Sequence, residues 1–173
     1  MKTRSKLATL ALSSGLAVAG FAGIAGPAHA ADTPATFAIT AGAISISVPA
    51  SASFGSVTTG TLIVTGPLGP VTVADNRGAL VNTWATTVAN SAFVTGGSTP
   101  AESVEATNVA YASGATTAHT GLGVFVPGTK ALPPTYTGAA GNSSTTWDPT
   151  VTFTLLSSQV AGTYTGTVTH SLA

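Results

Sequence analysis

Residues 147–172 read WDPTVTFTLLSSQVAGTYTGTVTHSL, and this stretch decides the fold class. Val151, Phe153 and Leu155 alternate with threonines, and the same alternation returns at Tyr164, Val168 and Leu172. A period of two with β-branched residues is typical of half-buried antiparallel strands. We therefore predict a pair of C-terminal strands joined through residues 157–162, with one face packed and the other coated with threonine.

The rest of the chain repeats this pattern in short segments. No stretch after residue 31 shows a helical period, and Gly, Pro, Asn and Ser divide the chain at intervals of about ten residues, which predicts about eight to ten strands. The expected fold is an all-β, antiparallel β-sandwich of the Ig-like or Greek-key type. One strand is expected from Phe37 to Val48 with a bend at Gly42, whereas residues 51–60, anchored by Phe54, residues 112–121 and residues 130–144 are expected to be irregular.

The N-terminus has the features of an export signal. Lys2, Arg4 and Lys6 precede an apolar region, and an Ala-His-Ala site ends at Ala30. The sequence predicts a helical signal peptide over residues 1–30, a flexible mature terminus over residues 31–35, and one domain over residues 36–173. An uncleaved membrane anchor is the alternative, because the apolar run is long enough to span a bilayer.

Removal of the leader leaves a sparsely charged chain. Arg77 and Lys130 are then its cations. The acidic residues are Asp32, Asp75, Glu102, Glu105 and Asp148. Nucleic-acid binding and attachment to anionic membranes both require clustered Lys and Arg, so neither partner is expected. The chain has no cysteine, which excludes a disulfide and predicts stability from strand pairing and burial alone.

Candidate catalytic and metal-binding groups are few. His119 and His170 remain after cleavage; we expect His119 to be solvated in a loop and His170 to point toward the packed face. No motif of a nucleophile, metal site or cofactor site is present, so no catalytic residue, metal or cofactor is predicted. Asp75 and Asn76 offer oxygens for calcium, but a structural turn formed by Asp75, Arg77 and Gly78 is the preferred interpretation.

Aromatic side chains are the remaining binding candidates, because exposed rings stack on sugars or partner side chains. Trp84 is expected in the core, since its strand alternates cleanly. Trp147 stands at a strand entrance before Asp148 and Pro149, and we expect it to be half-exposed and the better binding residue. Tyr164 is the third candidate.

The spacing Val71-x-Val73-x-Asp75-x-Arg77-Gly78, followed by Trp84, resembles the first signature of WxL-type surface proteins of Gram-positive bacteria. Residues 161–169 resemble the closing strand of that family, and Trp147 resembles its second tryptophan, so the resemblance covers residues 36–173. The name motif has Leu two residues after Trp, where this chain has Thr86 and Pro149. The resemblance implies export and non-covalent attachment to peptidoglycan.

Two functions follow as expectations. The first is a secreted, non-enzymatic protein of the cell surface that associates with the cell wall or with a surface partner. The alternative is a self-associating subunit of a fibre or matrix, because uncharged, threonine-coated strands leave sheet edges weakly protected and open to β-augmentation. An enzyme is a third possibility, disfavoured by the scarcity of catalytic groups.

Overall fold

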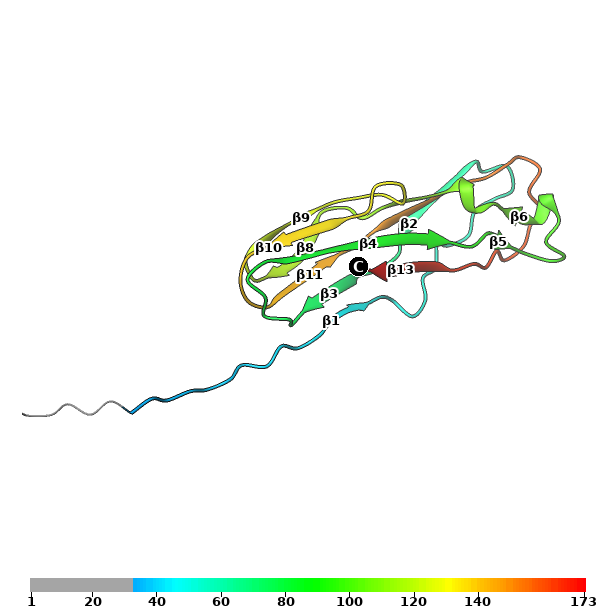
Figure 1. Ribbon diagram of the computed structural model, residues 1–173. Coiled ribbons are helices and arrows are strands. Elements are labelled where there is room, and N and C mark those ends of the chain that lie inside the picture. The colour runs from blue at the N-terminus through cyan, green and yellow to red at the C-terminus, as the bar shows by residue number, and fades with distance from the viewer. Residues whose placement is uncertain (1–32) are drawn as a thin grey trace, which may run out of the picture. The chain divides into compact units, whose positions relative to one another are not determined.

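The structure, a computed structural model, describes residues 33–173 (Figure 1). The predicted signal peptide lies outside the described residues, and residues 39–173 form one compact unit. The all-β, antiparallel fold class is confirmed, whereas the Ig-like or Greek-key type stays a prediction. Over residues 33–173, no helix is long and apolar enough to cross a membrane.

Thirteen strands and two single-turn 3₁₀ helices make up this unit. The strands are β1 (Ile44–Ser47), β2 (Ile63–Pro67), β3 (Val71–Asp75), β4 (Asn82–Asn90), β5 (Phe93–Val94), β6 (Ser103–Val104), β7 (Val109–Ala112), β8 (Thr116–Thr120), β9 (Gly123–Val126), β10 (Thr135–Gly138), β11 (Ser143–Trp147), β12 (Thr150–Thr154) and β13 (Val168–Leu172). The 3₁₀ helices are η1 (Pro100–Glu102) and η2 (Ala106–Asn108).

One layer consists of two sheets that share the same three segments of chain. Strands β1, β3, β11 and β8 pair in that order. The other sheet has the order β2-β12-β7, and a short break in the chain joins each of its strands to β3, β11 and β8, respectively. The break between β11 and β12 falls at Asp148 and Pro149, and proline has no N–H to donate to a ladder. Each long strand therefore bends and continues with the same neighbour.

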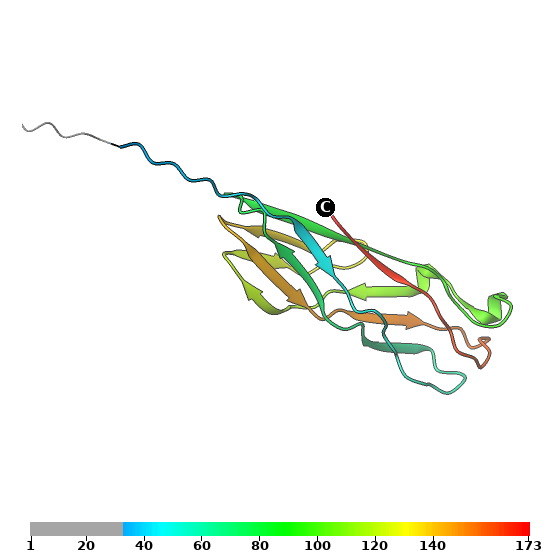
Figure 2. The same ribbon diagram turned by 90° about the horizontal axis from the view of Figure 1, so that it is seen from below.

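The second layer is the sheet β13-β4-β10-β9, extended by the small pair β5-β6 (Figure 2). Its central strand β4 buries every second residue, including Trp84, Thr86 and Val88. The two layers face each other through aromatic rings: Trp84 of β4 stacks on Trp147 of β11 with centroids 6.0 Å apart.

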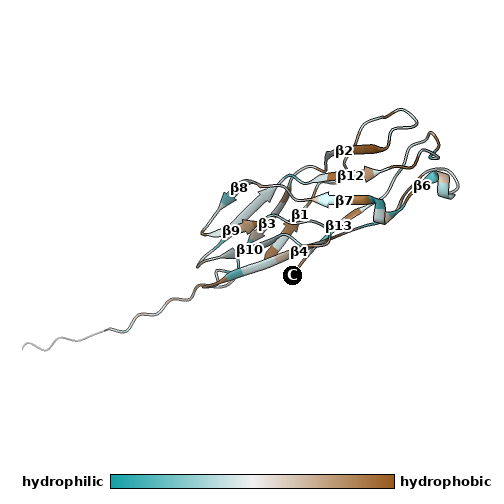
Figure 3. Ribbon diagram, turned by 90° about the horizontal axis from the view of Figure 1, so that it is seen from above, coloured by the Kyte–Doolittle hydropathy of each residue, from teal (hydrophilic) through white to brown (hydrophobic). Residues whose placement is uncertain are grey.

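The core has two clusters of buried side chains, and apolar residues recur along the strands that form them (Figure 3). One cluster lies between the first sheet and β4, β10. Its buried members are Val71, Val73, Trp84, Tyr136 and Trp147. The other cluster is formed by side chains of β7 and β12 together with β4, β5 and β6. Its buried members are Val88, Phe93, Val104, Val109, Tyr111, Val151 and Phe153. Phe54, the expected anchor of residues 51–60, contacts Phe153 with ring centroids 4.8 Å apart.

The predicted C-terminal strand pair is wrong. Strand β12 pairs with β2 and β7, whereas β13 pairs with β4 in the opposite layer. The alternation correctly gives strands at residues 150–154 and 168–172, whereas Tyr164 lies outside a strand. A period of two is the same whichever strand is the neighbour. The connection of residues 155–167 is long enough to cross from one sheet to the other.

Three further boundaries differ from expectation. Phe37 and Ile39 are not in a strand, because β1 begins only at Ile44. Residues 112–121 contain β8, and residues 130–144 contain β10, where threonine-rich segments find partners on β11, β4 and β9. Threonine favours strands when a ladder is available, although the flanking Gly and Pro indicated loops.

Replacing Trp147 with Ala is expected to destabilise the fold by about 3–5 kcal/mol, because the ring is fully buried between the layers. The free energy of unfolding from urea denaturation measures this loss. Thr154→Ala, at an exposed position of β12, is the control and should change stability by no more than about 0.5 kcal/mol. A loss below about 1 kcal/mol for Trp147→Ala would contradict the central role of this ring.

Candidate functional site

The turn after β3 is held by an ion pair. The Asp75 carboxylate is fully buried and accepts hydrogen bonds from the Arg77 backbone N–H at 3.1 Å, from Nε at 2.9 Å and from Nη2 at 2.7 Å. Arg77 also donates to the Thr83 carbonyl at 3.1 Å, and Gly78 supplies the positive φ of +61°. Arg77 holds the pKa of Asp75 below its ordinary value. The Arg77 guanidinium thus binds both carboxylate oxygens, and these contacts hold the turn.

Arg77→Met is expected to lower the free energy of unfolding at pH 7 by about 1–3 kcal/mol, because the buried carboxylate loses charged donors. In the wild type, the lowered pKa of Asp75 stabilises the fold above the unfolded pKa, and this contribution disappears as pH falls through the folded pKa. Urea denaturation from pH 7 to pH 2 should therefore show a smaller acid-dependent loss in Arg77→Met. An identical acid profile in the two proteins would count against the pair.

The two tryptophans lie in one aromatic cluster. Trp84 is 4% exposed and stacks on Tyr136 at 5.2 Å, while Trp147 is 0% exposed and stacks on Phe125 at 5.0 Å. The prediction of a half-exposed Trp147 is wrong, because β11 directs this residue inward immediately before the bend at Pro149. Neither indole ring is available to stack on a ligand.

A hydrogen-bonded series connects this cluster to the edge strand β13. Trp147 Nε1–H donates to the Tyr111 hydroxyl at 3.0 Å, and that hydroxyl lies 3.1 Å from His170 Nε2. Burial raises the pKa of Tyr111, so its hydroxyl stays protonated and lies within hydrogen-bond distance of Nε2. The other ring nitrogen, Nδ1, is a buried atom without a hydrogen-bond partner in the described structure.

Burial also lowers the pKa of His170 below 6.5. Protonation of His170 is therefore less favourable in the folded chain than in the unfolded chain. We expect the free energy of unfolding to be highest above pH 6.5 and to fall progressively as pH falls toward the folded pKa. His170→Gln should flatten this dependence between pH 8 and pH 5, measured by urea denaturation. A wild-type profile that is already flat over that range would refute the expectation.

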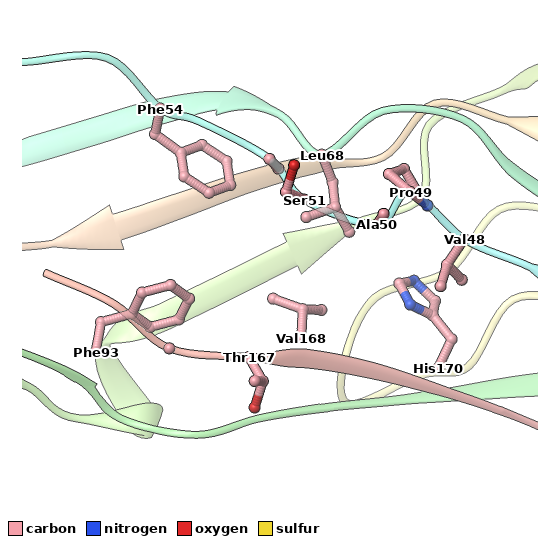
Figure 4. A pocket seen from close by; sticks show the side chains of 12 residues that line it. Val48, Pro49, Ala50, Ser51, Phe54, Leu68, Phe93, Thr167, Val168 and His170 are labelled. Atoms are coloured by element: carbon pink, nitrogen blue, oxygen red, sulfur yellow. The ribbon is translucent and has the colours of Figure 1, made fainter.

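His170 lines a cavity of about 180 Å³ between the layers (Figure 4). The segment after β1 forms one wall, and the beginning of β13 forms the other. Apolar side chains from both walls and from the core face the space. The lining includes Val48, Ala50, Phe54, Phe93, Val168 and His170.

The outer face of the second layer is a separate surface, which we call the threonine face. Its side chains are exposed or half-buried and carry no charge. They are Thr83, Ala85, Thr87 and Ala89 of β4, Thr135 and Thr137 of β10, Val124 and Val126 of β9, and Thr169 and Ser171 of β13. A shallow depression lies where Ala85 and Ala173, paired by backbone bonds of 2.8 and 2.9 Å, meet Thr135 and Thr137.

The cations of the described residues are engaged in the fold. Lys130 Nζ donates to Asn90 Oδ1 at 2.8 Å and to the carbonyls of Ala106 and Val109 at 2.7 Å each. Together with the Asp75–Arg77 pair, this uses both positive side chains of residues 33–173. A polyanion would therefore find no cluster of positive charge on this part of the chain.

Tyr164 and His119 have structural contacts. The Tyr164 hydroxyl lies 3.1 Å from the Ala101 carbonyl and 2.9 Å from the Val160 carbonyl, and its half-buried ring packs against the core. His119 is exposed, as expected, but it lies on β8 and its Nδ1 is 3.0 Å from Thr145 Oγ1. Within residues 33–173, no group of three or more His, Asp or Glu is placed to hold a metal ion.

The structure brings together residues that lie far apart in the sequence and that no sequence motif connects. Tyr111 and His170 are 59 positions apart, and residues 48–54 contributed no predicted site. The inward parity of His170 indicated its direction but not its partner. No pattern in the sequence indicates that the segment after β1 lies opposite β13.

Comparisons with known proteins add no relative. No family model matches the chain, and neither the curated proteins nor the solved structures contain a match. The resemblance to WxL-type proteins is therefore carried by the sequence signatures alone.

Proposed function

We propose that this is a secreted, non-catalytic protein of the bacterial cell surface that associates with a neutral part of the cell wall through the threonine face. The supporting observation is the composition of that face. It presents hydroxyl and methyl groups over four neighbouring strands without a charged side chain.

The chemistry of the threonine face suits a hydroxyl-rich polymer. Hydroxyl groups both donate and accept hydrogen bonds, and the methyl groups of Thr, Ala and Val offer apolar contact to sugar rings. The depression beside Thr135 and Thr137 gives a hollow where a sugar ring can lie. Because Trp84 and Trp147 are buried, the contact does not use the tryptophans.

Export supports the same proposal. Lys2, Arg4 and the apolar region before Ala30 resemble a secretion signal, and the WxL-like signatures suggest attachment to peptidoglycan. Peptidoglycan strands contain neutral sugars, and the polymer as a whole is large enough to contact several strands of the face at once.

Thr137→Lys tests the proposal. Thr137 is exposed on β10, and a lysine there would place an unpaired ammonium in the contact. We expect the apparent affinity for purified peptidoglycan, measured by co-sedimentation, to fall by about tenfold, which corresponds to about 1.4 kcal/mol.

The matched control is Thr154→Lys, another exposed strand threonine, on β12 of the other layer. It introduces the same charge and should bind as the wild type does. Equal weakening by both variants would indicate a general effect of charge. A wild-type protein that stays in the supernatant with peptidoglycan would refute wall binding altogether.

A further inference from the structure

Residues 36–40, Thr-Phe-Ala-Ile-Thr, are apolar at alternate positions but do not belong to a sheet in the described structure. We call them the N-terminal arm. Phe37 is 89% exposed and Ile39 is 88% exposed, although large apolar side chains in a strand-like pattern normally cover a core. The arm contains no charge and no proline, so it retains both the side-chain pattern and the N–H groups of a strand.

The edges of the two layers are open beside the cavity. Strand β1 ends one sheet, β13 ends the other, and they approach each other without pairing. Ala173 exchanges two backbone bonds with Ala85, and Thr167 pairs on the same side with Ser91. Because antiparallel pairing alternates, Val168 and His170 direct their N–H and C=O groups away from β4, toward the open edge. A strand placed there would find a ready ladder.

The cavity fits an aromatic side chain. Its volume is about 180 Å³, and a cavity of about 150 Å³ lined by apolar residues is enough to hold a benzene ring. Phe54 and Phe93 lie at one end of the cavity and Val48 at the other, with Val168 between them, so an inserted ring would contact apolar groups (Figure 4).

His170 adds a polar requirement. Its Nδ1 is buried and unpaired in the described structure, and a buried polar atom without a hydrogen-bond partner is costly. An extended peptide offers backbone N–H and C=O groups beside its side chains. The cavity thus matches an alternating peptide, which supplies both an apolar ring and a hydrogen-bonding group.

We propose that the N-terminal arm of one copy adds as a strand to the open edge of β13 in a second copy and inserts Phe37 into the cavity. Strand addition of this kind obtains affinity from main-chain hydrogen bonds and specificity from alternate side chains in pockets. Ile39, two positions on, points to the same side of the added strand and covers the neighbouring apolar wall.

The arm of the same copy is tethered to β1 through Gly42. Gly42 and Ala43 still pair with Asn76, at the end of β1 opposite to Val48. From Gly42 to Val48 an extended chain covers about 20 Å at about 3.3 Å per residue. An arm that reached its own cavity would have to reverse at Gly42 and run back along β1, a constraint of connectivity that does not apply to the arm of a second copy.

The first test is self-association by light scattering over a range of concentrations, using the purified protein with its predicted leader removed. The wild type should associate as concentration rises, and Phe37→Asp with Ile39→Asp should weaken association at least about tenfold. Both side chains are exposed, so the monomer should remain folded. Leu80→Asp is the matched control because Leu80 is an apolar residue 83% exposed outside the arm, and it should associate normally.

The second test identifies the contact. The chain has no cysteine, so Ile39→Cys and Ala50→Cys can be made as separate variants, mixed, and oxidised with copper phenanthroline. A disulfide between the two different variants is expected. Its absence, a strictly monomeric wild type, or association unchanged in the arm variant would overturn the proposal. A disulfide within a single chain carrying both substitutions, formed at high dilution, would instead assign the cavity to its own arm and also overturn it.

This proposal is independent of wall binding. The arm uses the edge of β13 and the cavity, whereas peptidoglycan binding is assigned to the outer threonine face. Thr137→Lys should leave self-association unchanged, and the arm variant should still co-sediment with peptidoglycan as a monomer.

Discussion

The stack of Trp84 on Trp147 is the contact on which the rest of the structure depends. It joins β4 of one layer to β11 of the other, with ring centroids 6.0 Å apart. Large aromatic rings contribute strongly to a core, and a chain without disulfides relies on such burial. The indole N–H of Trp147 is satisfied by Tyr111 at 3.0 Å, so full burial leaves this donor paired. Burial in this stack removes both rings from the surface, where a sugar could reach them.

The small number of charged residues affects both the outer faces of the sheets and their edges. Asp75 and Arg77 neutralise each other, and Lys130 binds three oxygens of the chain. The sheets therefore present mainly threonine, serine and alanine outward. Natural sheets commonly protect their edges with charged residues or proline, and β13 has neither. The low content of charged residues thus accounts for both the neutral face and the unprotected edge. These two surfaces suit different partners.

The edge between β1 and β13 shows why the position of one histidine matters. The Tyr111 hydroxyl lies 3.1 Å from His170 Nε2, and the other ring nitrogen, Nδ1, is left without a hydrogen-bond partner beside an apolar cavity. A closed barrel would have paired these edges and filled the space. Two separate layers leave it open, with free backbone groups on one side and aromatic side chains below.

The sequence alone determined the strands and their faces wherever the pattern was local. Alternation gave the all-β antiparallel class and the inward direction of Trp84, and the turn residues Asp75, Arg77 and Gly78 act within a few positions of one another. These features depend on near neighbours, because side chains alternate by geometry and a turn is closed by its own residues.

Only the tertiary structure decided which strands are neighbours. It placed β12 and β13 in opposite layers, buried Trp147, and left Phe37 and Ile39 exposed. A period of two is satisfied equally by any partner strand, so the choice depends on pairing between segments that are distant in sequence. The approach of His170 to Tyr111 and the cavity beside residues 48–54 follow from that choice, which is why no local pattern could have predicted them.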